Sequence, residues 1–199
     1  MNKLNLLLDL DQTLISAEAT EEYDFDDRSG KAEKFKFHDM DRYYIVFERP
    51  GLQEFLDYIF KTFNVSVWTA ASKDYAAWIV DNILIRGDAN RRLDWVFVSY
   101  HCSISEDLKD HSKSLDMLWD EFKLDGYNER NTLILDDYEE DVYLPQTDRC
   151  ILAKPFHFED PGSERDTFLK QLTAELKKYE TNPRGNPAAH INAVLHPGK

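Results

Sequence analysis

Apolar residues along the chain follow two alternating patterns. Short runs that are apolar almost throughout predict buried strands, at residues 4–10, 64–70, 95–100, 132–135 and 150–153. Elsewhere, apolar residues recur every three or four positions, which predicts helices, within residues 51–63, 72–84, 112–122 and 163–179. Apolar strands that alternate with helices are typical of a parallel sheet covered on both faces. The predicted fold class is therefore α/β, with a doubly wound, Rossmann-like parallel sheet.

Two segments interrupt this alternation. Residues 15–48 begin with many acidic residues and then place KFKFH and YYIVFE around DMDR, which predicts a small β-hairpin insertion. Residues 181–199 are rich in Pro, Gly and Asn, which predicts a flexible C-terminal tail. We therefore expect one domain over residues 1–180. An insertion of this size lines a groove but does not enclose a ligand, so we expect an open site.

The net charge argues against several classes of protein. The 199 residues include 24 Lys and Arg against 38 Asp and Glu, which gives a formal charge of −14. Proteins that bind nucleic acid or anionic membranes need basic patches, so we expect neither partner. No apolar run reaches the roughly 18 residues that a membrane span needs, and the acidic start MNKLNLLLDLD does not resemble a signal peptide. We expect a soluble intracellular protein, cytoplasmic or nuclear.

Carboxylates and hydroxyls gather where the predicted strands end. They follow the first, second and fourth predicted strands, as Asp9, Asp11, Thr13, Thr69, Asp136 and Asp137. Parallel sheets bind their ligands at the carboxyl ends of their strands, so we expect these side chains to lie close together. Neighbouring carboxylates raise one another's pKa unless a cation neutralises them. Because the candidate ligands are all oxygens, the sequence predicts a site for Mg²⁺.

Several motifs resemble a known family. DLDQT, which begins at Asp9, resembles the DxDx(T/V) signature of the haloacid dehalogenase (HAD) superfamily, and WTA and LILDD resemble its second and fourth motifs. The run RPGLQEFLDYIFKTFNVSVWTAASKDYA is similar to the FCP/SCP branch, whose members are also called NIF-like or CTD-type phosphatases. The resemblance covers residues 4–156. Members of this branch dephosphorylate serine or threonine in proteins, notably in the tail of RNA polymerase II.

The resemblance implies a role for each aspartate. Asp9 would attack phosphorus and form an aspartyl-phosphate, and Asp11 would protonate the leaving oxygen and later take a proton from water. The carboxylates of Asp9 and Asp136, with the backbone carbonyl of Asp11, would bind Mg²⁺. Asp137 would support the metal directly or through water, since many members of the branch carry Asn at this position.

The resemblance also implies residues that bind the phosphate. Thr69 would donate a hydrogen bond to a phosphate oxygen, and Thr13 would lie beside it and shape the first loop. The third motif of the family is a lysine that neutralises the nucleophile and the phosphate. We assign it to Lys113, which opens the predicted helix before the fourth strand, and Lys109 is the alternative.

These observations predict an Mg²⁺-dependent phosphatase that acts on phosphoserine or phosphothreonine through an aspartyl-phosphate, with a phosphorylated protein or peptide as its partner. One alternative keeps the chemistry and changes the substrate to a small molecule or a polynucleotide end. Another is a non-catalytic, Tim50-like binding protein on the same fold. The complete motif set favours an enzyme, because a scaffold has no need of both Asp9 and Asp11.

Overall fold

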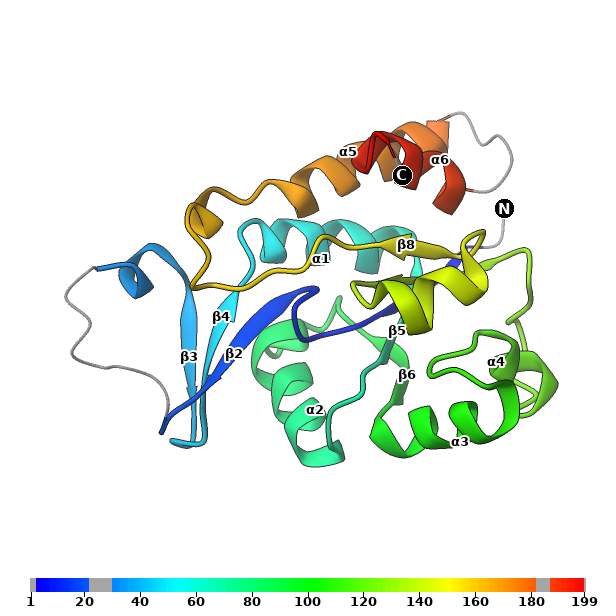
Figure 1. The fold of residues 1–199 in the computed structure, drawn as a ribbon, viewed down its shortest axis with the longest axis horizontal. Coiled ribbons are helices and arrows are strands. Elements are labelled where there is room, and N and C mark those ends of the chain that lie inside the picture. Colours follow the sequence, from blue (N-terminus) through cyan, green and yellow to red (C-terminus); the bar gives the residue numbers. More distant parts are fainter. Residues whose placement is uncertain (1–2, 22–29, 182–186, 199) are drawn as a thin grey trace.

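A five-stranded parallel sheet forms the centre of the molecule (Figure 1). The computed structural model describes residues 3–21, 30–181 and 187–198. The strands lie in the spatial order β6-β5-β1-β7-β8, with bounds Leu93–Phe97, Asn64–Trp68, Asn5–Leu8, Thr132–Asp136 and Cys150–Leu152. Chain order runs outward from β1 in both directions, so the strand order reverses at β1, which is where doubly wound folds bind their ligands. The predicted fold class and its five strands are confirmed.

Helices cover both faces of this sheet (Figure 1). On one face lie α1, α2, the π-helix η2, α5 and α6, with bounds Leu52–Thr62, Lys73–Ile79, Val80–Ile85, Phe168–Thr181 and Pro187–Leu195. On the other face lie α3, α4 and the π-helix η3, with bounds Ser99–Lys109, Asp116–Asp120 and Glu139–Tyr143. A short 3-10 helix, η4 (Leu144–Gln146), follows η3 directly.

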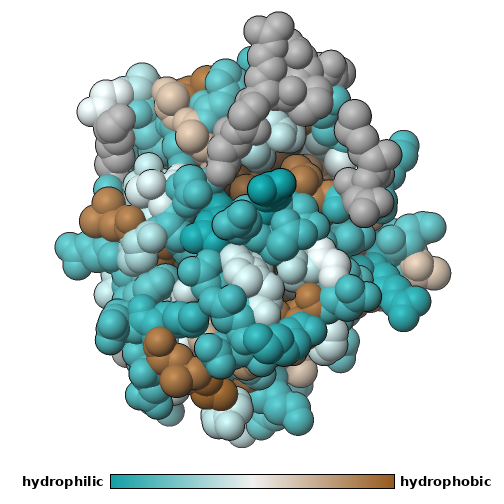
Figure 2. Space-filling view, turned by 90° about the vertical axis from the view of Figure 1, so that its right-hand side faces the viewer, coloured by the Kyte–Doolittle hydropathy of each residue, from teal (hydrophilic) through white to brown (hydrophobic). Residues whose placement is uncertain are grey.

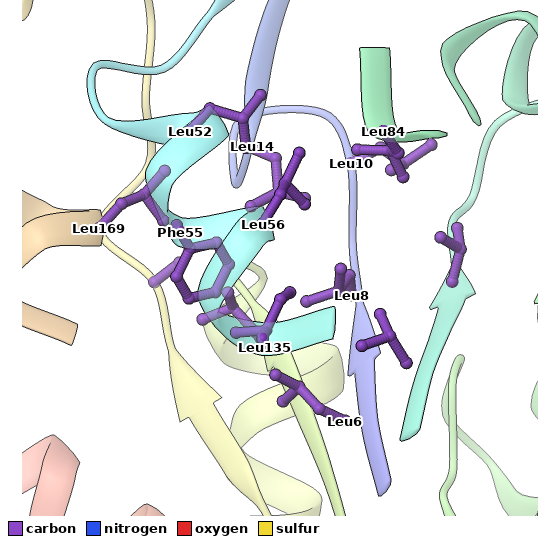
Figure 3. Packing of buried hydrophobic residues seen from close by; sticks show 14 of the residues in the cluster. Leu6, Leu8, Leu10, Leu14, Leu52, Phe55, Leu56, Leu84, Leu135 and Leu169 are labelled. Carbon is purple, nitrogen blue, oxygen red and sulfur yellow. The ribbon is translucent and has the colours of Figure 1, made fainter. Parts of the chain in front are cut away.

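The central strand β1 shows why its sequence is apolar throughout. Leu6 and Leu8 pack with Phe55 of α1 in one core cluster (Figure 3), whereas Leu7 packs with Trp68 in the other. Successive side chains of a strand point to opposite faces, and both faces of β1 are buried. Alternation of polar and apolar residues is therefore absent from this strand.

The segment predicted as a hairpin insertion forms a three-stranded antiparallel sheet, in the order β2-β4-β3. The predicted hairpin corresponds to β3 (Phe37–Met40) and β4 (Tyr44–Glu48), and β2 (Ile15–Ala19) adds an edge strand that the sequence pattern did not predict. The 3-10 helix η1 (Ala32–Lys34) precedes β3. Aromatic rings attach this insertion sheet to the chain that follows β8, and the Phe47 and Phe158 rings stack with their centroids 3.8 Å apart.

The segment after β6 differs from its prediction. The predicted strand ran to residue 100, but β6 ends at Phe97 and helix α3 begins at Ser99. Only Cys102 and Ser105 of this helix are buried. Because most of α3 faces solvent, few of its residues are apolar, and the helical period in its sequence is weak.

The C-terminal segment also corrects two predictions. The last predicted helix begins at Phe168 rather than at Ser163, because residues 163–165 form a separate 3-10 helix, η5, and the Asp166 carboxylate accepts the Phe168 N–H. Residues 187–195 were predicted to belong to a flexible tail, but they form helix α6. Its start tolerates proline in the first turn, and Ala188 and Ile191 are completely buried. Residues 182–186 and 199 of the predicted tail lie outside the described residues.

One face of the molecule presents a predominantly polar surface. In the face shown in Figure 2, most residues are hydrophilic and the apolar ones form small, separate patches. Among the residues that the structure describes, no helix has the length and apolar character needed to cross a bilayer.

Candidate active site

The ends of β1 and β7 bring three carboxylates together. Asp9 follows β1 directly, and its backbone N–H donates to the Leu135 carbonyl of β7 (3.0 Å). Asp136 is the last residue of β7, and Asp137 follows it. One carboxylate oxygen from each of Asp9, Asp136 and Asp137 lies within 4.8 Å of the others. The prediction that these three side chains lie close together is therefore confirmed.

A buried lysine neutralises two of these carboxylates. The Lys113 Nζ lies 2.6 Å from Asp9 Oδ1 and 2.7 Å from Asp136 Oδ2. Burial by itself lowers the pKa of Lys113, but the adjacent Asp9 and Asp136 outweigh this effect and raise it, so the ammonium stays charged. Lys109, the alternative for this position, instead pairs with Asp120 (3.1 Å) at the surface. We call Asp9, Asp136, Asp137 and Lys113 the carboxylate–lysine cluster.

Lys113 does not open a helix as predicted. Helix α4 begins at Asp116, and Lys113 lies in the preceding turn with a left-handed backbone (φ 54°). This conformation is unfavourable for a non-glycine residue, so the surrounding structure must hold it.

Two residues that the sequence did not single out hold this turn. The Gln146 side chain is buried, donates to the Lys113 carbonyl (3.0 Å) and accepts from the Leu115 N–H (3.1 Å). The Asp141 carboxylate accepts from both the N–H (3.0 Å) and the hydroxyl of Ser112. The turn is thus tied on both sides of Lys113 to the segment η3–η4.

Asp11 lies apart from the carboxylate–lysine cluster. Its carboxylate accepts a hydrogen bond of 2.5 Å from the Tyr75 hydroxyl of α2. Burial raises the pKa of Asp11 to about 6; the hydrogen bond from Tyr75 opposes this shift, and the neighbouring Asp9 adds to it. A carboxyl group with such a pKa can donate and accept a proton near neutral pH, which suits a general acid and base.

Asp137 and Thr13 contact each other. The Thr13 hydroxyl donates to Asp137 Oδ1 (3.0 Å), and Thr13 is fully buried. Burial raises the pKa of Asp137, and the charge of Asp9 adds to this effect. Thr13 therefore joins the loop after β1 to the end of β7, and in this structure its hydroxyl is engaged with Asp137.

The loop that carries Thr13 is also tied to the helical layer through Arg49. The Arg49 guanidinium donates to the Thr13 carbonyl (2.9 Å) and forms two hydrogen bonds of 3.0 Å to Asp166, which precedes α5. Arg49 is completely buried, and its guanidinium lies over the Phe168 ring. Its contacts are those of a structural residue.

The carboxylate–lysine cluster opens into a pocket of about 410 Å³. Thr69 follows β5 at the same edge of the sheet and lines this pocket, where its hydroxyl accepts the Ala71 N–H (3.1 Å). The pocket brings together most of the predicted site residues, in a lining formed by Asp9, Asp11, Gln12, Thr69, Ala70, Ala71, Lys113, Asp136, Asp137, Tyr138 and Pro155.

A second hollow of about 560 Å³ adjoins the first. It shares Asp11 and Ala71 with the pocket and runs between the insertion sheet and the start of α2. We call it the tyrosine groove, because three of its lining residues are Tyr43, Tyr44 and Tyr75. The sequence predicted that the insertion lines a groove, but it did not single out Tyr75 as part of the lining.

The donor set of the cluster fits a hard divalent cation. Asp9, Asp136 and Asp137 offer only carboxylate oxygens at close range, and no cysteine or histidine takes part in this group. Oxygen ligands of this kind suit Mg²⁺. The carboxylate of Asp11 does not belong to the group, which is consistent with a metal contact through its backbone carbonyl alone.

The fold and the carboxylate–lysine cluster agree with the HAD-type phosphatase domain that the motifs resemble. A family model described as NLI interacting factor-like phosphatase matches residues 4–184, so the chain belongs to that family. The chain is 41% identical over 179 residues to the CTD phosphatase-like protein 355R of Invertebrate iridescent virus 6, a match that covers 88% of this chain and 98% of the viral protein. Its counterpart in Invertebrate iridescent virus 3 is 37% identical over 181 residues, with 88% and 96% covered.

Solved structures show the same fold at lower identity. Fcp1, described as an essential RNA polymerase II CTD phosphatase, superposes with a TM-score of 0.62 at 19% identity, over 96% of this chain and 70% of that chain. A fission yeast Fcp1 variant bound to beryllium fluoride gives 0.56 at 18% identity, over 97% of this chain and 61% of that chain. The likeness to these structures concerns the fold alone.

Proposed function

We propose that the protein is an Mg²⁺-dependent phosphoprotein phosphatase that hydrolyses phosphoserine or phosphothreonine through an aspartyl-phosphate on Asp9. The observation that carries this proposal is the contact of Lys113 with Asp9 (2.6 Å), because both residues line the same pocket. A carboxylate is a weak nucleophile for a phosphate dianion unless the negative charge around both is neutralised. The buried ammonium supplies part of that neutralisation.

The residues of the chain divide the reaction between them. An Asp9 oxygen forms a bond to phosphorus while the bond from phosphorus to the seryl oxygen breaks, and Asp11 donates a proton to the departing oxygen. Asp11 then takes a proton from the water that attacks phosphorus, which releases phosphate and restores Asp9. Lys113 and Thr69 orient the phosphoryl oxygens. Asp9, Asp136 and the Asp11 carbonyl would hold Mg²⁺, with Asp137 contributing directly or through water, and the ion would supply further charge neutralisation when bound.

The shape of the site supports a peptide substrate. Sites that enclose small metabolites exclude water with a lid, whereas the described part of the insertion is an open three-stranded sheet beside the pocket. The tyrosine groove runs from Asp11 along that sheet and offers aromatic surface to an extended chain. The name of the viral relatives and the description of Fcp1 both refer to a CTD phosphatase, which agrees with a phosphorylated peptide as substrate.

Phosphate release by the purified protein tests this proposal. We expect hydrolysis of a phosphoserine peptide and of p-nitrophenyl phosphate with Mg²⁺, loss of both activities after chelation with EDTA, and recovery when Mg²⁺ is restored. The kcat/KM for the peptide should exceed that for sugar phosphates and nucleotides.

Two outcomes would contradict parts of the proposal. A clear preference for a free metabolite or a polynucleotide end would refute the protein substrate and leave the chemistry intact. Absence of turnover on every substrate, in a folded protein supplied with Mg²⁺, would instead support a binding protein.

A further inference from the structure

One hydrogen bond connects the tyrosine groove to Asp11. The Tyr75 hydroxyl donates to Asp11 Oδ1 at 2.5 Å, and it is the one hydrogen bond that the described residues give to that carboxylate side chain. The two residues are 64 positions apart in the chain and come from different elements, the loop after β1 and helix α2. The contact is therefore a product of the tertiary fold.

Tyr75 is held in place from two directions. Its backbone N–H donates to the hydroxyl of Ser72, the N-cap residue of α2 (3.4 Å), so it belongs to the first turn of that helix. Its ring forms a T-shaped contact with the Tyr44 ring of the insertion sheet, with centroids 5.4 Å apart and planes at 84°. Edge-to-face contacts of this kind fix ring orientation. The hydroxyl thus has a defined direction toward Asp11.

A general acid depends on this kind of constraint. The carboxyl group of Asp11 must place one oxygen beside the leaving oxygen of the substrate, and a misplacement of about 1 Å can cost on the order of 10²-fold in rate. Unconstrained, an aspartate side chain rotates among several staggered conformers. The hydrogen bond to Oδ1 restricts that rotation and leaves Oδ2 as the oxygen that carries the proton.

We propose that Tyr75 is a positioning residue that holds the Asp11 carboxyl in the orientation for proton transfer to the leaving group. The inference rests on the proposed function, in which Asp11 is the general acid. Since Tyr75 and Tyr44 also line the groove, a peptide in the groove contacts the residue that orients the acid. Tyr75 itself does not take part in bond making or breaking.

Two small substrates separate this role from peptide binding. Phenyl phosphate and p-nitrophenyl phosphate are too small to extend along the groove as a peptide would, and they differ in the leaving group. The phenol of the first, with a pKa of about 10, departs poorly without a proton, whereas p-nitrophenol is much more acidic and needs little help. The parameter kcat/KM includes only steps up to departure of the leaving group, so it is independent of the later hydrolysis of the aspartyl-phosphate.

The variant Tyr75→Phe keeps the ring and removes the hydroxyl. We expect its kcat/KM to fall about 10-fold with phenyl phosphate and to stay within about twofold with p-nitrophenyl phosphate, since general acid catalysis as a whole contributes about 10²–10⁴-fold. Tyr58→Phe is the matched control, because the Tyr58 hydroxyl donates to the Glu180 carboxylate (2.7 Å) on the surface. It should leave both values unchanged.

The variant Asp11→Asn separates failure of the inference from failure of the proposed function. It should lose more activity with phenyl phosphate than with p-nitrophenyl phosphate, and adding Tyr75→Phe to it should cost nothing further. If Asp11→Asn loses both activities equally, the acid assignment is wrong, and the inference falls with it. If Asp11→Asn discriminates but Tyr75→Phe does not, or if the two losses add, the inference alone is overturned.

Discussion

The carboxylate–lysine cluster and the tyrosine groove share a border at Asp11 but are constructed in different ways. In the cluster, Asp9, Asp136 and Lys113 are between 1% and 5% exposed, and each charge has a partner. In the groove, Tyr43 is 73% exposed and Tyr44 is 38% exposed. The cluster belongs to the parallel sheet and its following turns, whereas the groove lies between the insertion sheet and α2.

Under the proposed function, this difference separates the chemistry from the recognition of substrate. Charges that stabilise a transferring phosphoryl group act strongly only where water is scarce and the geometry is fixed. A rigid scaffold satisfies both conditions. Side chains that contact a substrate must instead remain open to it, and they can be exchanged at little cost to folding. Substitutions in the two regions should therefore have different signatures, and the four predictions below test that expectation.

The largest effect is expected at the nucleophile. Asp9→Asn should lower turnover by roughly 10⁴-fold or more on every substrate, because an amide neither attacks phosphorus nor balances the charge of Lys113. The measurement is phosphate release from a phosphoserine peptide and from p-nitrophenyl phosphate at saturating Mg²⁺. Circular dichroism and thermal melting establish that the variant is folded. Substantial turnover by a folded Asp9→Asn protein would exclude Asp9 as the nucleophile.

The next effect concerns the lysine. Lys113→Ala should lower kcat/KM on both substrates by about 10²–10³-fold, the usual cost of removing one preorganised charge at a reacting centre. It should also lower the melting temperature, because Asp9 and Asp136 are left buried without their cation. Lys109→Ala is the control, since its partner Asp120 is exposed and surface ion pairs contribute little. The reverse ranking of these two variants would transfer the role to Lys109.

The sequence predicted the residues of the cluster, but it did not predict the residues that hold them in place. The reason is physical. Apolar runs that end in aspartate specify both a strand and the point where it ends, and a parallel sheet then brings those ends together. The left-handed turn at Lys113 has no such local signal. It depends on Gln146, which lies 33 residues further along the chain, and only the folded structure reveals that contact.

The same limit explains two other differences. Tyr75 fits the apolar pattern of its helix, and nothing local distinguishes a hydroxyl that points to solvent from one that reaches Asp11. Helix α6 follows a segment rich in Gly, Pro and Asn, and what stabilises it is tertiary. Its Asn192 side chain accepts a hydrogen bond from the Leu152 N–H (2.9 Å) and donates one to the Cys150 carbonyl (2.8 Å). Asn192 therefore supplies hydrogen-bond partners to backbone groups on the outer edge of β8.

Substitution of Gln146 tests how strongly turnover depends on the fixed geometry of the cluster. Gln146→Ala should lower the free energy of unfolding by about 1–3 kcal/mol, because a buried carbonyl and a buried N–H lose their partner. It should also lower kcat on both substrates about tenfold, with KM less affected, since Lys113 loses its orientation and keeps its charge. Gln171→Ala, a change at an exposed glutamine on α5, is the control. Loss of stability with full kcat would show that the turn holds Lys113 without Gln146.

The smallest effect is expected in the groove, and it should depend on the substrate. Tyr43→Ser removes an exposed ring from the groove wall, and exposed aromatic contacts contribute about 0.5–1.5 kcal/mol. The kcat/KM for a phosphoserine peptide should therefore fall about 3- to 10-fold, mainly through KM. Hydrolysis of p-nitrophenyl phosphate should not change, because that substrate needs only the pocket. Tyr100→Ser is a matched control: its ring on α3 is 69% exposed and lines neither hollow. An equal loss on both substrates, or the same loss in Tyr100→Ser, would show that the groove does not bind the peptide.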